Sequence, residues 1–325
     1  MHASDSDPTN SLRTLLAQGG YQDVLDRYAI LAAGGAPHEP AIAISVAIAA
    51  TRLGHLDEGE SLATEAQSGF RRRADDDGRL RALNLLGAIA YERGDLERAV
   101  ERWTGALELA RALGDGLFVA RAANNLAITH HLSARVDIAR SLYREAMLAY
   151  QRLADRRGLA ESNHNLAITC RVDGQTALAA NLNIEAVRHA EAVGDPVLLA
   201  LMLVGRAETH LEQSEDALAE DGLNRAERLC QTANDELDLA EVARVRAELE
   251  LKRSRPDLAL DRAEQGRSIA ERHGSRLLQG ECAAAASQAM NRLGRADEAS
   301  RYRSEAEGLF RRLGATLYLE RLPAA

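Results

Sequence analysis

One turn signal recurs every forty residues along most of the chain. The marks are small or turn-forming residues, namely Gly54, Gly94, Ala134, Gly174, Ser214, Ser254 and Gly294. A second set lies in the same phase, at Gly114, Ala154, Gly194, Asn234, Gly274 and Gly314. Each repeat therefore has two breaks, which predicts a unit of helix, turn, helix, turn. A chain of such units is predicted to fold as an all-α solenoid, because one unit alone cannot bury its apolar face.

Small residues keep the same register as the turns. Five residues after each mark of the first set stand Gly59, Ala99, Ala139, Ala179, Ala219, Ala259 and Ala299, and seven residues before it stand Ala47, Gly87, Ala127, Ala167, Ala207, Ala247 and Ser287. We expect these two positions to face each other where the helices of a pair approach closely. The predicted pairs are 39–53 with 56–73, 78–93 with 97–113, 117–133 with 136–153, 158–173 with 176–193, 197–213 with 216–233, 236–253 with 256–273, and 276–293 with 296–313.

Between the breaks, apolar residues recur at helical spacing, as in Leu96, Val100 and Trp103. Gly and Asn at the second set of breaks can take the left-handed conformation that ends a helix. The aspartates that follow, Asp115, Asp155, Asp195 and Asp235, are expected to cap the next helix.

The residues from Leu86-Gly87 to Tyr91, then Gly94-Asp95, Ala99, Trp103 and Ala106, resemble the tetratricopeptide consensus. The departures are an aromatic one place late at Tyr91, a missing closing proline, and a unit of forty residues where the usual repeat has about 34. Longer repeats of this kind are similar to those of kinesin light chains and Pins-like scaffolds, in Asn125-Leu126-Ala127 and Asn165-Leu166-Ala167. The ending from Leu313-Gly314 to Leu322 resembles the close of repeat regions in bacterial regulators. The resemblance implies a right-handed superhelix of about eight antiparallel helix pairs.

The repeats also predict the domain organisation. Residues 1–35 form a divergent N-terminal capping pair, with helices at Leu12 to Gln18 and Tyr21 to Ala33, closed by Gly34 to Pro37. Residues 36–314 form the array, and residues 315–325, with a helix at Leu317 to Leu322, form the C-terminal cap. We expect all three to be parts of one continuous solenoid domain.

Composition narrows the classes of partner and the compartment. The net charge is -9, which disfavours nucleic acid and anionic membranes. No apolar stretch has the roughly 20 residues of a membrane span, and the polar start, Met1 to Asn10, has no secretory pattern. The three cysteines, Cys170, Cys230 and Cys282, are widely spaced and suit a reducing compartment. We therefore expect a cytoplasmic protein, and the ends of a solenoid leave a homodimer as an open alternative.

In tetratricopeptide arrays the first helix of each pair lines a concave groove, so the resemblance implies the residues that a ligand would meet. The candidate peptide-binding residues are Arg81, Asn84, Tyr91, Arg121, Asn124, Asn125, His131, His164, Asn165 and Arg171. The same positions in later pairs give a mainly acidic wall of Glu208, Glu212, Glu241, Arg244, Glu248, Lys252 and Glu281. Asn125 and Asn165 could clamp the backbone of a peptide, since an amide both donates and accepts. The alternative is that each Asn only satisfies a neighbouring helix or turn.

No residue pattern nominates an enzyme or a cofactor. His130, His131, His164 and Cys170 come from consecutive first helices, but the paired ligand spacing of a zinc site is missing, so no metal is expected. The sequence has no phosphate loop, no nucleophile elbow and no acid and base pair. Two non-catalytic functions remain open. The first is an adaptor or scaffold that binds proteins or peptides in its groove, and the alternative is a peptide sensor that controls a transcription factor or kinase. The roughly 35 residues before the array are too few for a helix-turn-helix module, which favours the adaptor.

Overall fold

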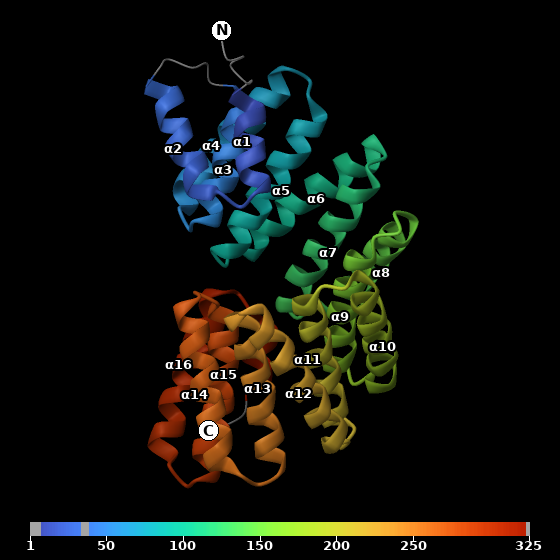
Figure 1. The fold of residues 1–325 in the computed structure, drawn as a ribbon, viewed down its shortest axis with the longest axis vertical. Helices are drawn as coiled ribbons and strands as arrows, with labels where there is room; N and C mark the ends of the chain where they lie inside the picture. The colour runs from blue at the N-terminus through green and yellow to red at the C-terminus, as the bar shows by residue number, and fades with distance from the viewer. Residues whose placement is uncertain (1–7, 34–38, 323–325) are drawn as a thin grey trace. The chain divides into compact units, whose positions relative to one another are not determined.

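The computed structural model describes residues 8–33 and 39–322, and every regular element in those ranges is an α-helix (Figure 1). The predicted break from Gly34 to Pro37 lies outside the described residues, as do the first seven and the last three residues of the two predicted caps. Contacts divide the chain into two compact units, unit 1 (residues 1–122) and unit 2 (residues 123–325). The expectation of one continuous solenoid stays a prediction.

Unit 1 contains the first six helices. They are α1 (Pro8–Ala17), α2 (Tyr21–Ala33), α3 (Pro40–Arg52), α4 (Leu56–Arg72), α5 (Asp76–Glu92) and α6 (Leu96–Leu113), and α7 (Gly116–Leu132) begins in unit 1 and continues into unit 2. The prediction that α1 begins at Leu12 is wrong by four residues, because Pro8 is well tolerated in the first turn of a helix. Leu12 and Val24 pack with Ile42 and Val46 of α3, so the divergent first pair covers the end of this unit's core.

Unit 2 contains the end of α7 and the remaining helices. They are α8 (Val136–Arg152), α9 (Arg156–Val172), α10 (Thr176–Val193), α11 (Pro196–Glu212), α12 (Asp216–Ala233), α13 (Glu236–Lys252), α14 (Pro256–Arg272), α15 (Arg276–Arg292), α16 (Ala296–Arg312) and α17 (Thr316–Arg321). The seven predicted pairs are confirmed, with helix ends within two residues of those predicted. The all-α solenoid prediction is therefore confirmed.

The turns have the backbone conformation that the repeat predicts. Every break in both sets has a positive φ, from 54° at Ala154 to 81° at Gly54. Five of these breaks hold a residue other than glycine, although the left-handed region costs such residues energy. The tertiary packing on both sides of each turn therefore overrides the local preference. The predicted aspartate caps are confirmed, and Asp195 Oδ1, for example, accepts the amides of Val197 and Leu198.

The small residues lie where the two helices of a pair meet. Ala127 and Ala139 share one core cluster with Ala167 and Ala179, around the buried ring of Tyr143. In the last pair the Ser287 hydroxyl donates a hydrogen bond to the Ala299 carbonyl at 2.8 Å, which requires the two backbones to approach closely. The prediction that the two small positions face each other is confirmed.

The first helices of the pairs form the inner layer of unit 2. Helices α9, α11 and α13 each contact the first helix of the next pair, whereas α10, α12 and α14 contact only first helices among the elements that the structure describes. Because the first helices lie closer together than the second helices, the array curves with its first helices on the concave side. The side chains on that side are the ones that a ligand of the groove would meet.

Candidate functional site

A cavity of about 380 Å³ opens on the inner side of unit 2. Its walls come from the first helices α9, α11, α13 and α15, and from Phe310 of α16 and Tyr318 and Arg321 of the terminal helix α17. The lining mixes charged side chains with apolar ones such as Leu211 and Leu251. A cavity with this combination can bury apolar ligand surface and fix orientation through a few polar groups.

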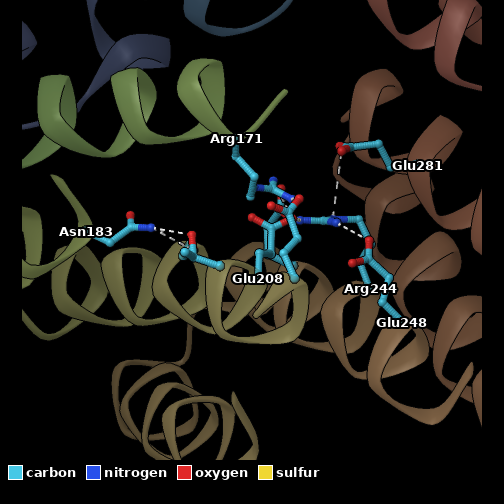
Figure 2. Close-up of polar contacts among 10 residues, drawn as sticks. Arg171, Asn183, Glu208, Arg244, Glu248 and Glu281 are labelled. Carbon is cyan, nitrogen blue, oxygen red and sulfur yellow. Dashed lines mark hydrogen bonds and ion pairs between the residues drawn. The ribbon is translucent and has the colours of Figure 1, made fainter. Parts of the chain in front are cut away.

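Arg244 of α13 lies at the centre of a buried ion cluster beside this cavity. Its guanidinium donates to Glu208 at 2.8 Å, to Glu241 at 3.0 Å and to Glu248 at 2.9 Å. Figure 2 shows Glu208 of α11 and Arg244 and Glu248 of α13 pointing toward one another. Only 7% of Arg244 is exposed, so its charge depends on these carboxylates rather than on water.

Glu208 of α11 links two repeats because it pairs with two arginines. It lies 2.8 Å from Arg244 of the following first helix and 3.1 Å from Arg171 of the preceding one, and Arg171 also contacts Glu212 at 3.3 Å. Burial by itself would raise the pKa of Glu208, but the two guanidinium groups outweigh it and lower the pKa to about 2. Glu208 is therefore ionised, and α9, α11 and α13 are joined by one charge network.

Glu281 of α15 is the least well compensated acid of this region. Its carboxylate lies 4.0 Å from the Arg244 Nε, which already donates a hydrogen bond to Glu241. Burial, together with the nearby carboxylates of Glu241 and Glu208, raises the pKa of Glu281 to about 8 despite the attraction of Arg244. Glu281 is therefore largely protonated at neutral pH, and the predicted acidic wall carries less negative charge than its residues suggest.

Four of the predicted groove residues belong to unit 1. Arg81 is exposed on α5, and the carbonyl of Asn84 accepts the indole N–H of Trp103 at 3.1 Å. The ring of Tyr91 lies 5.9 Å from that of Trp103, and burial raises the Tyr91 pKa to about 12. Arg121 is exposed on α7, with its guanidinium 6.0 Å from the Phe118 ring.

The predicted amide clamp lies in unit 2. Asn125 of α7 and Asn165 of α9 are half-buried, and each carbonyl accepts a threonine hydroxyl one turn later. Within the described residues neither side-chain amide donates a hydrogen bond, whereas the neighbouring Asn124 accepts one from Ser162 at 3.3 Å. The two amides therefore keep donors available for a ligand, and their role as a clamp stays a prediction.

The two predicted histidines are buried rather than exposed to the groove. His131 and His164 are 6% and 7% exposed, and burial lowers the pKa of each to about 4, with neighbouring arginines adding to the effect. Both rings are therefore neutral at pH 7. His131 Nδ1 lies 3.1 Å from the Thr169 hydroxyl, and its ring meets Tyr318 edge to face at 6.4 Å. In the part of the chain that the structure describes, no group of three or more His, Cys, Asp or Glu residues could hold a metal ion.

Two features of unit 2 were missed by sequence reasoning. Tyr318 and Arg321 of α17 reach the cavity, although the sequence suggested only a cap. Asn183 of α10 is also buried and donates to the Gly205 carbonyl at 3.1 Å and to the Thr209 hydroxyl at 2.8 Å (Figure 2). Asn183 could have been found, because the equivalent positions one repeat earlier and later hold Tyr143 and Leu223.

Comparison with known proteins supports the repeat assignment. The family profile described as Tetratricopeptide repeat matches residues 80–147, which cover most of α5, all of α6 and α7, and most of α8. No curated protein sequence matches the chain. No helix in the described residues combines the length and the apolar character that a membrane span requires.

Several solved structures share the fold at low sequence identity. The Rap conjugation gene regulator of the plasmid pLS20, in complex with the Phr* peptide, has a TM-score of 0.69 and 13% identity, over 84% of this chain and 74% of that one. NprR in complex with its cognate peptide NprX has a TM-score of 0.64 and 12% identity, over 92% and 87% of the two chains. Aspartyl phosphate phosphatase F from Bacillus subtilis has a TM-score of 0.58 and 13% identity, over 95% and 96%. At these identities the likeness establishes the helical repeat fold alone.

Proposed function

We propose that this helical-repeat chain, which matches a tetratricopeptide-repeat profile over residues 80–147, is a non-catalytic adaptor that binds a peptide segment of a partner protein on the inner face of unit 2. The observation that carries this proposal is the cavity of about 380 Å³, which is lined by four successive first helices. Its mixture of charged and apolar walls suits a peptide better than a small apolar molecule. We expect the protein to act in the cytoplasm.

The amide pair provides the backbone contacts in this proposal. Asn125 and Asn165 are one repeat apart on α7 and α9, and an amide can donate to a peptide carbonyl while it accepts from a peptide N–H. Recognition of the peptide backbone gives affinity with little dependence on sequence, and the cavity then selects side chains. This division of roles is common in grooves that bind extended or helical peptides.

The two similar structures that contain peptides support a second candidate. The pLS20 regulator and NprR were both solved with a peptide bound, and the first is described as a gene regulator. A sensor and an adaptor would use the same groove, but the affinity of a sensor for a second protein must change when the peptide binds. The two functions therefore differ in whether a bound peptide alters a second interaction.

The groove is tested with a phage-displayed random heptapeptide library selected on the full chain. Selected peptides are then titrated by calorimetry into the wild type and into Asn125→Ala/Asn165→Ala. We expect the double variant to keep its helical circular dichroism and to lose roughly thirtyfold in affinity, since two hydrogen bonds to the peptide are worth about 1 kcal/mol each. Asn181→Ala/Asn291→Ala, at two exposed amides, is the matched control. Equal affinity in all three proteins would place the binding site away from the clamp.

A further inference from the structure

The last helix of the chain folds back over the inner face of unit 2. Helix α17 is anchored on the preceding pair, since Leu317 is 6% exposed and the ring of Tyr318 lies 5.3 Å from that of Phe310. From there two side chains reach the opposite side of the cavity. The Tyr318 ring meets His131 of α7 edge to face, and the Arg321 Nη1 donates to the carbonyl of Val172 at 3.0 Å, across 149 residues of sequence.

The hydrogen bond of Arg321 completes a pattern among the inner helices. Lys252 of α13 donates to the Leu211 carbonyl at the end of α11, and Arg292 of α15 donates to the Leu251 carbonyl at the end of α13. In both cases a cation from the next repeat contacts the last turn of the previous first helix. Such a contact is favourable because unpaired carbonyls give that end of a helix a partial negative charge.

Helix α9 lacks this cation from its neighbour. The residue in register is Glu212, which stands forty residues before Lys252 and carries the opposite charge. Glu212 instead accepts a hydrogen bond from Arg171 at 3.3 Å. The carbonyl end of α9 is therefore open to a cation from elsewhere, and Arg321 of α17 supplies it.

We propose that α17 is an internal ligand of the groove, and that a partner peptide binds by displacing it. This inference rests on the proposed peptide-binding function and names the class of peptide. The peptide presents an aromatic ring to the slot between His131 and Phe310, and three residues later a Lys or Arg to the carbonyl end of α9. These are the two contacts that Tyr318 and Arg321 make within the chain.

The contacts across the cavity can be released without disturbing the repeats. Helix α17 packs its backbone against α16, and the side chains of Tyr318 and Arg321 make its ring contact with α7 and its hydrogen bond to α9. Arg321 is an exposed residue, so its hydrogen bond is open to competition from water and from another cation. A peptide that offers an aromatic ring and a cation can replace the contacts of Tyr318 and Arg321 with equivalent contacts of its own.

The test uses the full chain and a fluorescein-labelled synthetic peptide with the sequence of residues 316–322, Thr-Leu-Tyr-Leu-Glu-Arg-Leu. Its binding is measured by fluorescence anisotropy to the wild type, to Tyr318→Ala/Arg321→Ala and to Arg311→Ala, an exposed arginine of α16 that serves as the matched control. We expect at least tenfold tighter binding to the double variant than to the other two proteins. A peptide with alanine in place of its tyrosine and arginine should bind none of them. Equal binding to all three proteins, or binding of both peptides alike, would overturn the proposal.

Hydrogen exchange on the same proteins gives an independent readout. In the wild type we expect protection in α17, and in the double variant a loss of protection confined to α17 and the end of α9, with α13 to α16 unchanged. An unprotected α17 in the wild type would refute its role as an internal ligand. Library peptides that bind the wild type while the residue 316–322 peptide fails on the double variant would remove this inference and leave the proposed function standing.

Discussion

The buried cluster around Arg244 gives the sharpest test of how unit 2 is held together. In Arg244→Met the side-chain volume is nearly kept, but Glu208 loses one of its two guanidinium partners and Glu241 and Glu248 lose theirs. Glu208 is 5% exposed and retains only Arg171 at 3.1 Å. Breaking a buried pair on one side costs about 3–5 kcal/mol, because the remaining charge is left without compensation.

The size of this loss should depend on pH in a defined direction. The wild-type pKa of Glu208 is lowered to about 2, so this group contributes stability above its unfolded pKa, and the contribution is lost as pH falls through 2. In Arg244→Met, burial is opposed by one arginine instead of two, so the Glu208 pKa rises. The variant can then take up a proton at mildly acidic pH. We expect the difference in the free energy of unfolding between the wild type and Arg244→Met to shrink as the pH is lowered from 7 to 4.5.

Urea unfolding followed by two probes measures this gap. Helical circular dichroism reports on the whole chain, whereas the single tryptophan, Trp103, packs within unit 1 and reports on that unit. Arg244→Met should lower the urea midpoint seen by circular dichroism and leave the midpoint seen by fluorescence nearly unchanged. Two probes are needed because a chain with two compact units need not unfold in one step.

The matched control is Arg188→Met on α10. Its side chain is 61% exposed and pairs with Glu185 one turn away, and exposed pairs of this kind contribute little to stability because water screens them. Adding Glu208→Gln to Arg244→Met should recover part of the loss, because the uncompensated charge is removed. Equal destabilisation by the two methionine variants, or a gap that does not change with pH, would refute the assignment of Arg244 as the centre of a buried network.

Two further predictions concern packing and charge on the inner helices. Ala167→Leu should destabilise the protein by roughly 1–3 kcal/mol through overpacking, because Ala167 is 1% exposed in the cluster that contains Ala179, and an unchanged melting temperature would show that this approach is not close. Glu281→Gln should raise the melting temperature more at pH 8.5 than at pH 5. The folded-state pKa of Glu281 is raised to about 8, so stability falls as pH rises from the unfolded pKa toward 8, and glutamine removes that loss. A constant difference across this pH range would contradict the raised pKa.

The helical repeat could be predicted from the sequence because its signals are local. Turn residues such as Gly94 and Asn234, and caps such as Asp195, act within a few residues of the helix ends that they determine. The alanine register could be predicted for a related reason, since every pair must satisfy the same close approach. Small residues at Ala127 and Ala139 are the repeated solution to that constraint.

The charge network was only partly visible in the sequence. Arg171, Glu208 and Arg244 are separated by 37 and 36 residues, which is close to one repeat, so their proximity follows from the solenoid once its register is known. Their pairing does not follow, because the same residue types on the outer face would be solvated. The sequence therefore predicted a set of candidate groove residues that ends at Arg171 and a separate, mainly acidic wall, whereas the structure joins Arg171 to Glu208 of that acidic wall.

The position of α17 could not be predicted from the repeat at all. Arg321 and Val172 are 149 residues apart, and their contact depends on the summed curvature of every pair between them. One residue nevertheless indicates where such a contact is needed. Glu212 occupies the position that Lys252 and Arg292 occupy in the next two repeats. Among α9, α11 and α13, α9 is therefore the helix whose carbonyl end receives no hydrogen bond from a cation of the following repeat.

The same arrangement explains why the net charge of the chain is a poor guide to its ligand. Glu208 forms ion pairs with Arg171 and Arg244, and the raised pKa of Glu281 favours its neutral form. Little uncompensated negative charge therefore faces the cavity. In the proposed peptide complex, the ligand is selected by the carbonyl end of α9 once Arg321 is displaced, by the amides of Asn125 and Asn165, and by the aromatic slot between His131 and Phe310. Each of these recognises hydrogen-bond geometry or shape more than total charge, which is what a groove needs in order to distinguish one peptide from many others of similar charge.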